Sequence, residues 1–121
     1  MADFEIYESA VRSREDLGAF FEHDGDTGYF YLMEDPHRVS ENEDESRIIA
    51  HIWILNGKPD FGQDDVAVEW DRTERRVGVF IKGQLWAAFD QFGGRYGGRY
   101  RPDEEPAISD DIVEEFKPLT N

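Results

Sequence analysis

His51 is the ionisable side chain within an otherwise apolar stretch, residues 48–55, which reads IIAHIWIL. An imidazole can act as a general base near neutral pH when a carboxylate orients it, and Asp90 is the candidate for that carboxylate. The alternative is a histidine buried by strand neighbours and hydrogen-bonded to an adjacent strand or loop. We favour this structural interpretation, because the sequence specifies no nucleophile or second catalytic group.

Asp24 and Asp26 begin a pattern that resembles a calcium loop, since carboxylates two residues apart can face one hard cation. The rest of the pattern fails, because Tyr29 stands where such a loop needs glycine and Asp35 stands where it needs glutamate. Aspartates that bond their own backbone in a hairpin turn explain the same residues. We therefore expect a turn here rather than a metal site.

Residues 93–100 read GGRYGGRY, a tandem repeat in which arginine and tyrosine sit on a glycine-rich backbone. Such side chains can stack on bases or grip phosphate. The candidate binding residues are Arg95, Tyr96, Arg99 and Tyr100. A purely structural loop is the favoured alternative, because paired glycines also satisfy tight turns. A third interpretation pairs this basic segment with the acidic run at 41–45.

Other catalytic and metal-binding patterns are missing from the sequence. His23 and His37 share no ligand spacing with His51, and there is no phosphate-binding glycine loop, serine elbow or HExxH motif. Cysteine is absent, which excludes disulfides, thiol nucleophiles and thiolate metal sites. The sequence thus favours a non-enzymatic protein without a cofactor.

Acidic residues number 28 against 13 basic ones, which gives a net charge of −15. This charge repels nucleic acid and anionic lipid, and it favours basic protein partners at long range. The plainer interpretation, which we rank first, is that the charge keeps the protein soluble. Aromatic residues make up 14% of the chain, which predicts a packed core despite the charge.

The length of 121 residues predicts a single domain, 1–121, with its core over residues 16–92. Exposed loops are expected at 34–47, which is rich in acidic residues, and at 93–107. The first residues lack the apolar run of a signal peptide, and no apolar run approaches membrane-spanning length. A cytoplasmic location without membrane contact is therefore expected.

Alternating aromatic runs at 17–23 and 29–33 flank a loop of Gly, Asp and Thr, which predicts a β-hairpin. Residues 48–55 are apolar on both alternating faces, which predicts a central strand covered on each side. Residues 66–70, 76–81 and 84–90 predict a three-strand meander.

Lys82 and Gly83 fit a two-residue turn between the last two strands of this meander. The pairing expected from this turn places three residues opposite three others: Ile81 opposite Gln84, Val79 opposite Trp86, and Val77 opposite Ala88. Near the end of the chain, Asp111 is expected to cap a short helix that Pro118 stops. The fold class is therefore mainly β, a single antiparallel sheet of hairpins, rolled or sandwich-like, with one short C-terminal helix.

The stretches FEHDGDTGYFYLM, IIAHIWILN and VEWDRTERRVGVFIKGQLWAAFD resemble a family of small bacterial proteins, domain of unknown function family 2251. The resemblance covers most of residues 16–100. The chain departs from the family pattern at Lys82, where asparagine is expected, and in the repeat after Asp90. It implies no activity, cofactor or catalytic residue.

Three classes of function follow. The leading class is a non-enzymatic cytoplasmic binding or interaction domain, and its sharper form is an acidic inhibitor or immunity-type protein for a basic partner. The second class is a small-ligand or enzyme domain that uses His51 and Asp90 in a pocket. The third is a homo-oligomer, suggested by strands that are apolar on both faces.

Overall fold

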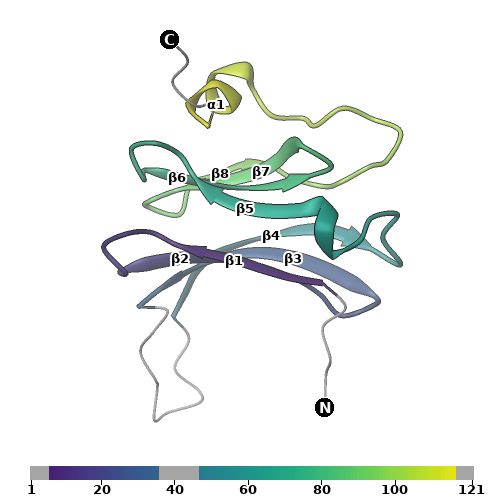
Figure 1. The fold of residues 1–121 in the computed structure, drawn as a ribbon, viewed down its shortest axis with the longest axis horizontal. Coiled ribbons are helices and arrows are strands. Elements are labelled where there is room, and N and C mark those ends of the chain that lie inside the picture. Colours follow the sequence, from purple (N-terminus) through teal and green to yellow (C-terminus); the bar gives the residue numbers. More distant parts are fainter. Residues whose placement is uncertain (1–5, 36–46, 117–121) are drawn as a thin grey trace.

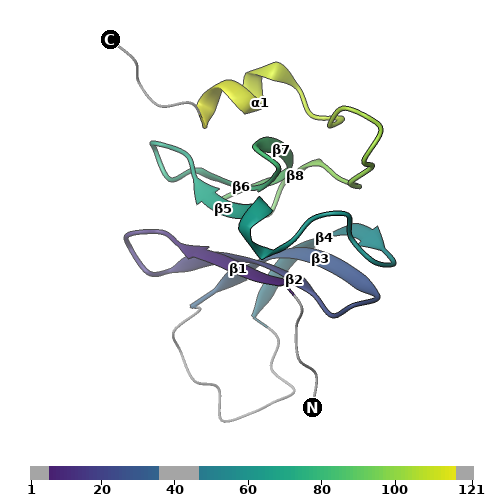
Figure 2. The ribbon, with the colours of Figure 1, turned by 45° about the vertical axis from the view of Figure 1, so that its right-hand side comes forward.

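A computed structural model describes residues 6–35 and 47–116. It contains two antiparallel sheets, each of four strands in chain order. The first sheet is formed by β1 (Ile6–Val11), β2 (Leu17–His23), β3 (Thr27–Glu34) and β4 (Ile48–Asn56). A short 3₁₀ helix, η1 (Gln63–Asp65), leads into the second sheet, which is formed by β5 (Val66–Trp70), β6 (Arg76–Ile81), β7 (Gln84–Asp90) and β8 (Arg95–Gly97). The sheets stack as two layers, and α1 (Asp110–Glu115) lies on the far side of the second (Figures 1 and 2).

The expected fold class, mainly antiparallel β with one short C-terminal helix, is confirmed, but the hairpins form two stacked sheets rather than one. His37, the acidic run at 41–45 and Pro118 lie outside the described residues. Among the residues that are described, no helix has the length and apolarity needed to cross a membrane.

The core lies between the two sheets, because side chains in the regular parts of each strand alternate between the inner and the outer face. Phe30 on β3 and Phe89 on β7 are fully buried, and their rings stack with centroids 4.9 Å apart. This pair ties the first sheet to the second at the centre of the sandwich. Phe21 on β2 is also fully buried, and it contacts Phe61 in the connection between the sheets.

The predicted meander is confirmed, since β5, β6 and β7 have the expected bounds. Lys82 and Gly83 both have positive φ, at 53° and 82°, as a two-residue hairpin turn requires. Ile81 pairs with Gln84 as predicted.

Beyond this turn the predicted register is wrong, because Val79 pairs with Ala87 and Val77 pairs with Phe89. The register shifts next to Phe80, which pairs with Leu85 and leaves Trp86 as the extra residue of a β-bulge. The bulge lets Trp86 and Ala87, which are adjacent in sequence, both join the core between the sheets.

The prediction of a covered central strand at 48–55 is wrong, because β4 lies at the end of its sheet and one of its faces is open. Ile52 and Ile54 point into the core, whereas Trp53 is 42% exposed. His51 is exposed as well, so its predicted burial is also wrong. The apolar pattern marked a strand correctly, but it did not reveal which face would be covered.

Two strands were not predicted. β1 pairs along its whole length with β2, although Glu8 and Ser9 interrupt its apolar pattern. β8 forms inside the glycine-rich repeat, where a loop was expected, and pairs with β7. The C-terminal helix forms as expected, but Ser109 rather than Asp111 is its N-cap residue.

Candidate functional site

The outer face of the first sheet carries a set of aromatic side chains that we call the aromatic face. Strand pairing arranges it in two rows across the sheet, with one residue per strand. The first row is Tyr7, Glu22, Tyr29 and Trp53, and the second is Ser9, Phe20, Tyr31 and His51. The face therefore combines large rings with a single carboxylate.

The aromatic face is open to solvent. Tyr7, Tyr29 and Trp53 keep 42%, 44% and 42% of their surface exposed, although each lies within a regular strand. Large rings of this kind are normally buried, and an exposed group of them on one face is typical of interaction surfaces. Tyrosine and tryptophan suit such a place, because their polar tips tolerate water while their rings offer contact area.

Glu22 lies within this group of rings, flanked by Tyr7 on one side and Tyr29 on the other. The Tyr31 hydroxyl donates a hydrogen bond of 2.6 Å to the Glu22 carboxylate, and the Tyr31 ring stacks on Phe20 at 5.4 Å. Burial, together with the Glu22 carboxylate, raises the pKa of Tyr31 above its usual value. The phenol thus stays a donor, and the carboxylate is fixed among rings.

One cation of the chain itself lies against the aromatic face. The Arg99 guanidinium lies over the Trp53 ring, 4.1 Å from its centroid. This distance is within the range of a cation–π interaction. Arg99 belongs to the glycine-rich repeat, so the repeat reaches the edge of the aromatic face.

The other side chains of the repeat lie in different places. Tyr100 is buried, packs edge-on against Trp86 with centroids 4.7 Å apart, and donates a hydrogen bond of 2.7 Å to Asp60. Tyr96 lies on the second sheet beneath the Arg76 guanidinium. Arg95 is exposed. The structure does not bring the four predicted binding residues together, and the expected solvent exposure of Tyr100 is wrong.

The backbone geometry of the repeat requires glycine at position 97. The φ of Gly97 is +73°, and a side chain would run into the carbonyl oxygen of Trp86 on the neighbouring strand. A backbone that approaches this closely at positive φ requires glycine. Gly97 therefore meets a structural need, and only Arg99 connects the repeat with the aromatic face.

The two residues of the catalytic hypothesis lie in different sheets. His51 is on the outer face of β4, where its ring meets Tyr29. Asp90 ends β7 and accepts hydrogen bonds of 2.8 Å from the N–H groups of Phe92 and Gly94 and of 3.0 Å from the Tyr96 hydroxyl. The described contacts of the two side chains have no residue in common.

The carboxylate of Asp24 accepts hydrogen bonds of 2.9 Å from the N–H groups of Asp26 and Thr27. This geometry is that of an Asx turn at the β2–β3 hairpin. His23, at the end of β2, is fully buried, and its two ring nitrogens bond to the Gly25 N–H and the Gly57 carbonyl. Within the described residues no group of three or more His, Asp or Glu side chains could hold a metal ion.

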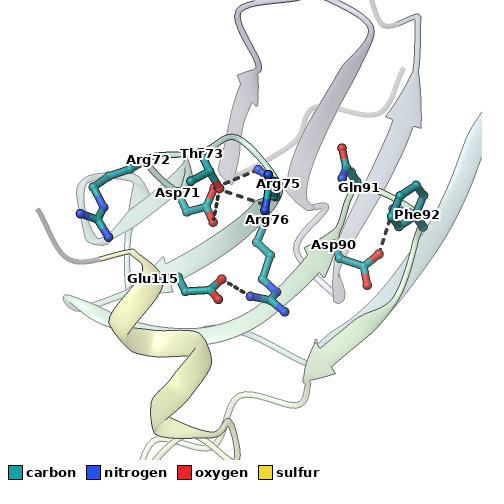
Figure 3. Close-up of a pocket in the computed structure, with 9 residues that line it drawn as sticks. All are labelled: Asp71, Arg72, Thr73, Arg75, Arg76, Asp90, Gln91, Phe92 and Glu115. Atoms are coloured by element: carbon teal, nitrogen blue, oxygen red, sulfur yellow. Dashed lines mark hydrogen bonds and ion pairs between the residues drawn. The ribbon is translucent and has the colours of Figure 1, made fainter.

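Sequence reasoning missed a cleft next to the β5–β6 turn, which Figure 3 shows. Its volume is about 640 Å³, and the turns β5–β6 and β7–β8 and the end of α1 surround it. Its lining residues include Arg72, Arg75, Arg76, Asp71, Asp90 and Glu115. The signal in the sequence was the run DRTERR at 71–76, which places three arginines within five positions of an acidic chain.

Comparison with known families gives a match over residues 4–111 to DUF2251, described as an uncharacterized protein conserved in bacteria. The chain belongs to this family. The DUF2251 match includes all eight strands, and hence the whole aromatic face, while Glu115 of the cleft lies beyond it. No curated protein and no solved structure matched the chain. The resemblance expected from the sequence is thus confirmed, and the family description carries no activity.

Proposed function

We propose that this DUF2251 chain is a non-enzymatic cytoplasmic binding domain whose aromatic face receives a basic segment of a partner protein. The observation that carries the proposal is Glu22, a carboxylate fixed among Tyr7, Phe20, Tyr29 and Tyr31 on an exposed sheet face. An arginine or lysine of the partner would gain an ion pair with Glu22 and ring contacts at the same time.

The geometry of the first row suits a guanidinium. Tyr7 and Tyr29 lie two strands apart with Glu22 between them, which corresponds to about 10 Å between backbones. A flat cation that enters between the two rings would contact the Glu22 carboxylate. Arg99 over Trp53, at the end of the same row, is an example of the same interaction within the chain.

The charge of the protein supports a basic partner over the alternatives. A net charge of −15 speeds the approach of a basic protein and opposes nucleic acid and anionic membranes. The same charge opposes a second copy of the chain on this face. The partner is therefore expected to be a protein whose contact surface is rich in arginine or lysine.

The test is calorimetric titration of the intact protein with an arginine-rich peptide, followed by the same titration with two variants. Glu22→Gln and Tyr29→Ala are each expected to weaken binding at least about tenfold, as central contacts of an interface do. The matched control is Glu69→Gln, which removes the same charge from an exposed position on β5, and it is expected to change the Kd less than about twofold.

Equal weakening by Glu22→Gln and Glu69→Gln would show that only net charge matters, and would refute the proposal. Sedimentation of the protein alone tests the alternative that the chain forms a homo-oligomer. Dimers that Tyr29→Ala dissociates would assign the aromatic face to self-association instead.

A further inference from the structure

We propose that the cleft beside the β5–β6 turn binds the phosphate group of a small molecule. This site lies on the second sheet and involves none of the aromatic-face residues, so it is independent of the proposed protein-binding role. The argument depends on which charges in the cleft are already neutralised and which are not.

The carboxylates that line the cleft are engaged within the protein. Asp71 is buried and accepts hydrogen bonds from the Thr73 hydroxyl and from the N–H groups of Arg75 and Arg76. Asp90 is held by the β7–β8 turn and by Tyr96. Glu115 pairs with Arg76. These contacts hold the acidic side chains in place and leave them less able to form ion pairs with the other arginines of the cleft.

The arginines of the cleft are less completely engaged. Arg72 and Arg75 are exposed, and neither forms an ion pair with any residue in 6–35 or 47–116. Arg76 lies over the Tyr96 ring and contacts Glu115, but its Nε is buried without a hydrogen-bond acceptor among the described residues. Two of the three guanidinium groups of the cleft, those of Arg72 and Arg75, therefore have no carboxylate partner among the described residues.

Phosphate is the anion that this arrangement suits best. Guanidinium groups bind phosphate oxygens through paired hydrogen bonds, and a dianion with three free oxygens can engage more than one arginine. The net charge of the chain does not exclude this, because charges beyond about 8 Å are largely screened at physiological ionic strength. At 640 Å³, the cleft is within the size range of small-molecule sites.

The test uses inorganic phosphate as the probe, added at constant ionic strength, with backbone amide NMR shifts as the readout. The double variant Arg72→Gln with Arg75→Gln is expected to weaken phosphate binding at least about tenfold. The matched control, Arg95→Gln with Arg101→Gln, removes two exposed arginines outside the cleft, and is expected to change the Kd less than about twofold.

A third variant acts in the opposite direction. Glu115→Gln removes the carboxylate that competes for Arg76, so it is expected to tighten phosphate binding about threefold or more. Tightening cannot result from general damage to the fold. Acetate at the same concentration distinguishes phosphate from any carboxylate, and is expected to bind at least about tenfold more weakly.

Shifts confined to residues 71–76, 90–92 and 115 that follow this pattern of variants would support the proposal. Shifts spread over the surface, equal effects of the two double variants, or equal binding of acetate would overturn it. These results are independent of the aromatic face, since Glu22→Gln is expected to leave phosphate binding unchanged.

Discussion

The outer faces of the two sheets differ in what lies against them. On the second sheet, Leu85 and Ala88 are buried beneath Ile112 of α1, and the Phe80 and Phe116 rings meet edge to face at 5.6 Å. On the first sheet the outer face is open, and Tyr29 and Trp53 remain more than two-fifths exposed. Two sheets of equal strand number thus present one buried and one exposed outer surface.

The two outer faces also differ in amino-acid composition, in line with one being covered and the other open. The covered face contains Leu85, Ala88 and the Phe80 and Tyr96 rings, together with Gly78, whose missing side chain leaves space for Leu85 and Phe116. The open face contains Tyr, Trp, His and Glu, whose polar groups can be hydrated. Thus α1 shields the outer surface of the second sheet from water. The side chains of the aromatic face can instead be hydrated when no partner is bound.

Paired truncations test this contrast most strongly. Leu85→Ala is expected to lower the free energy of unfolding by about 3 kcal/mol, because it opens a cavity under α1. Tyr29→Ala, on the open face, is expected to cost about 1 kcal/mol or less. Urea unfolding curves of the two variants provide the measurement, and equal losses would mean that the two faces are equally buried in solution.

The β6–β7 hairpin supports the covered face, and its turn gives the second test. Gly83→Val is expected to cost about 1 to 3 kcal/mol, because a β-branched residue is strained at the φ of +82° found there. Gly62→Val is the control, since Gly62 has ordinary φ and open space around it. Thermal unfolding should separate the two variants, and an unchanged melting temperature for Gly83→Val would mean that the turn is wrongly placed.

The smallest expected effect concerns Asp90, beside the covered sheet. Burial alone would raise its pKa, but hydrogen bonds from Gly94, Phe92 and Tyr96 lower it below the ordinary value of 3.8. A carboxylate whose pKa is lowered by folding stabilises the fold at pH values above its unfolded-state pKa. The stability that Asp90 contributes is therefore lost as the pH falls from about 4 through the lowered pKa.

Urea unfolding measured between about pH 2 and 5 should therefore show a shallower loss of stability for Asp90→Asn than for the unmodified protein. Asp64→Asn removes the same charge from an exposed position and provides the reference curve. If Asp90→Asn follows the unmodified protein at every pH, the hydrogen bonds to Asp90 do not stabilise the β7–β8 turn.

Local signals were sufficient to predict most strands. The meander from Val66 to Asp90 was located correctly, because its turns contain the residues that tight turns require. The register after Phe80 was not, because a bulge depends on how Trp86 and Ala87 fit the core rather than on the turn. β1 was missed, because Glu8 and Ser9 interrupt its apolar pattern and its stability comes from pairing with β2.

The candidate site was harder to predict. The sequence drew attention to His51 and to the repeat, yet Glu22, which lies at the centre of the aromatic face, shows no motif of its own. Its surroundings depend on the pairing of β1, β2 and β3, which brings Tyr7 and Tyr29 to either side of it. The arginines of the cleft form a charge run in the sequence, but the pairing of Arg76 with Glu115 depends on where α1 packs.

The order of strands along the chain has a consequence for assembly of the fold. Each sheet consists of consecutive strands, so the connection at 57–65 separates two fragments that each retain all the strand pairings of one sheet. A chain cut there, for example after Lys58, would keep these pairings and expose the apolar inner face of each sheet. The two fragments are therefore expected to recombine into the sandwich when mixed, with Phe30 and Phe89 stacked across the new interface. Recombination would also return Arg99 to Trp53 and so restore the edge of the aromatic face.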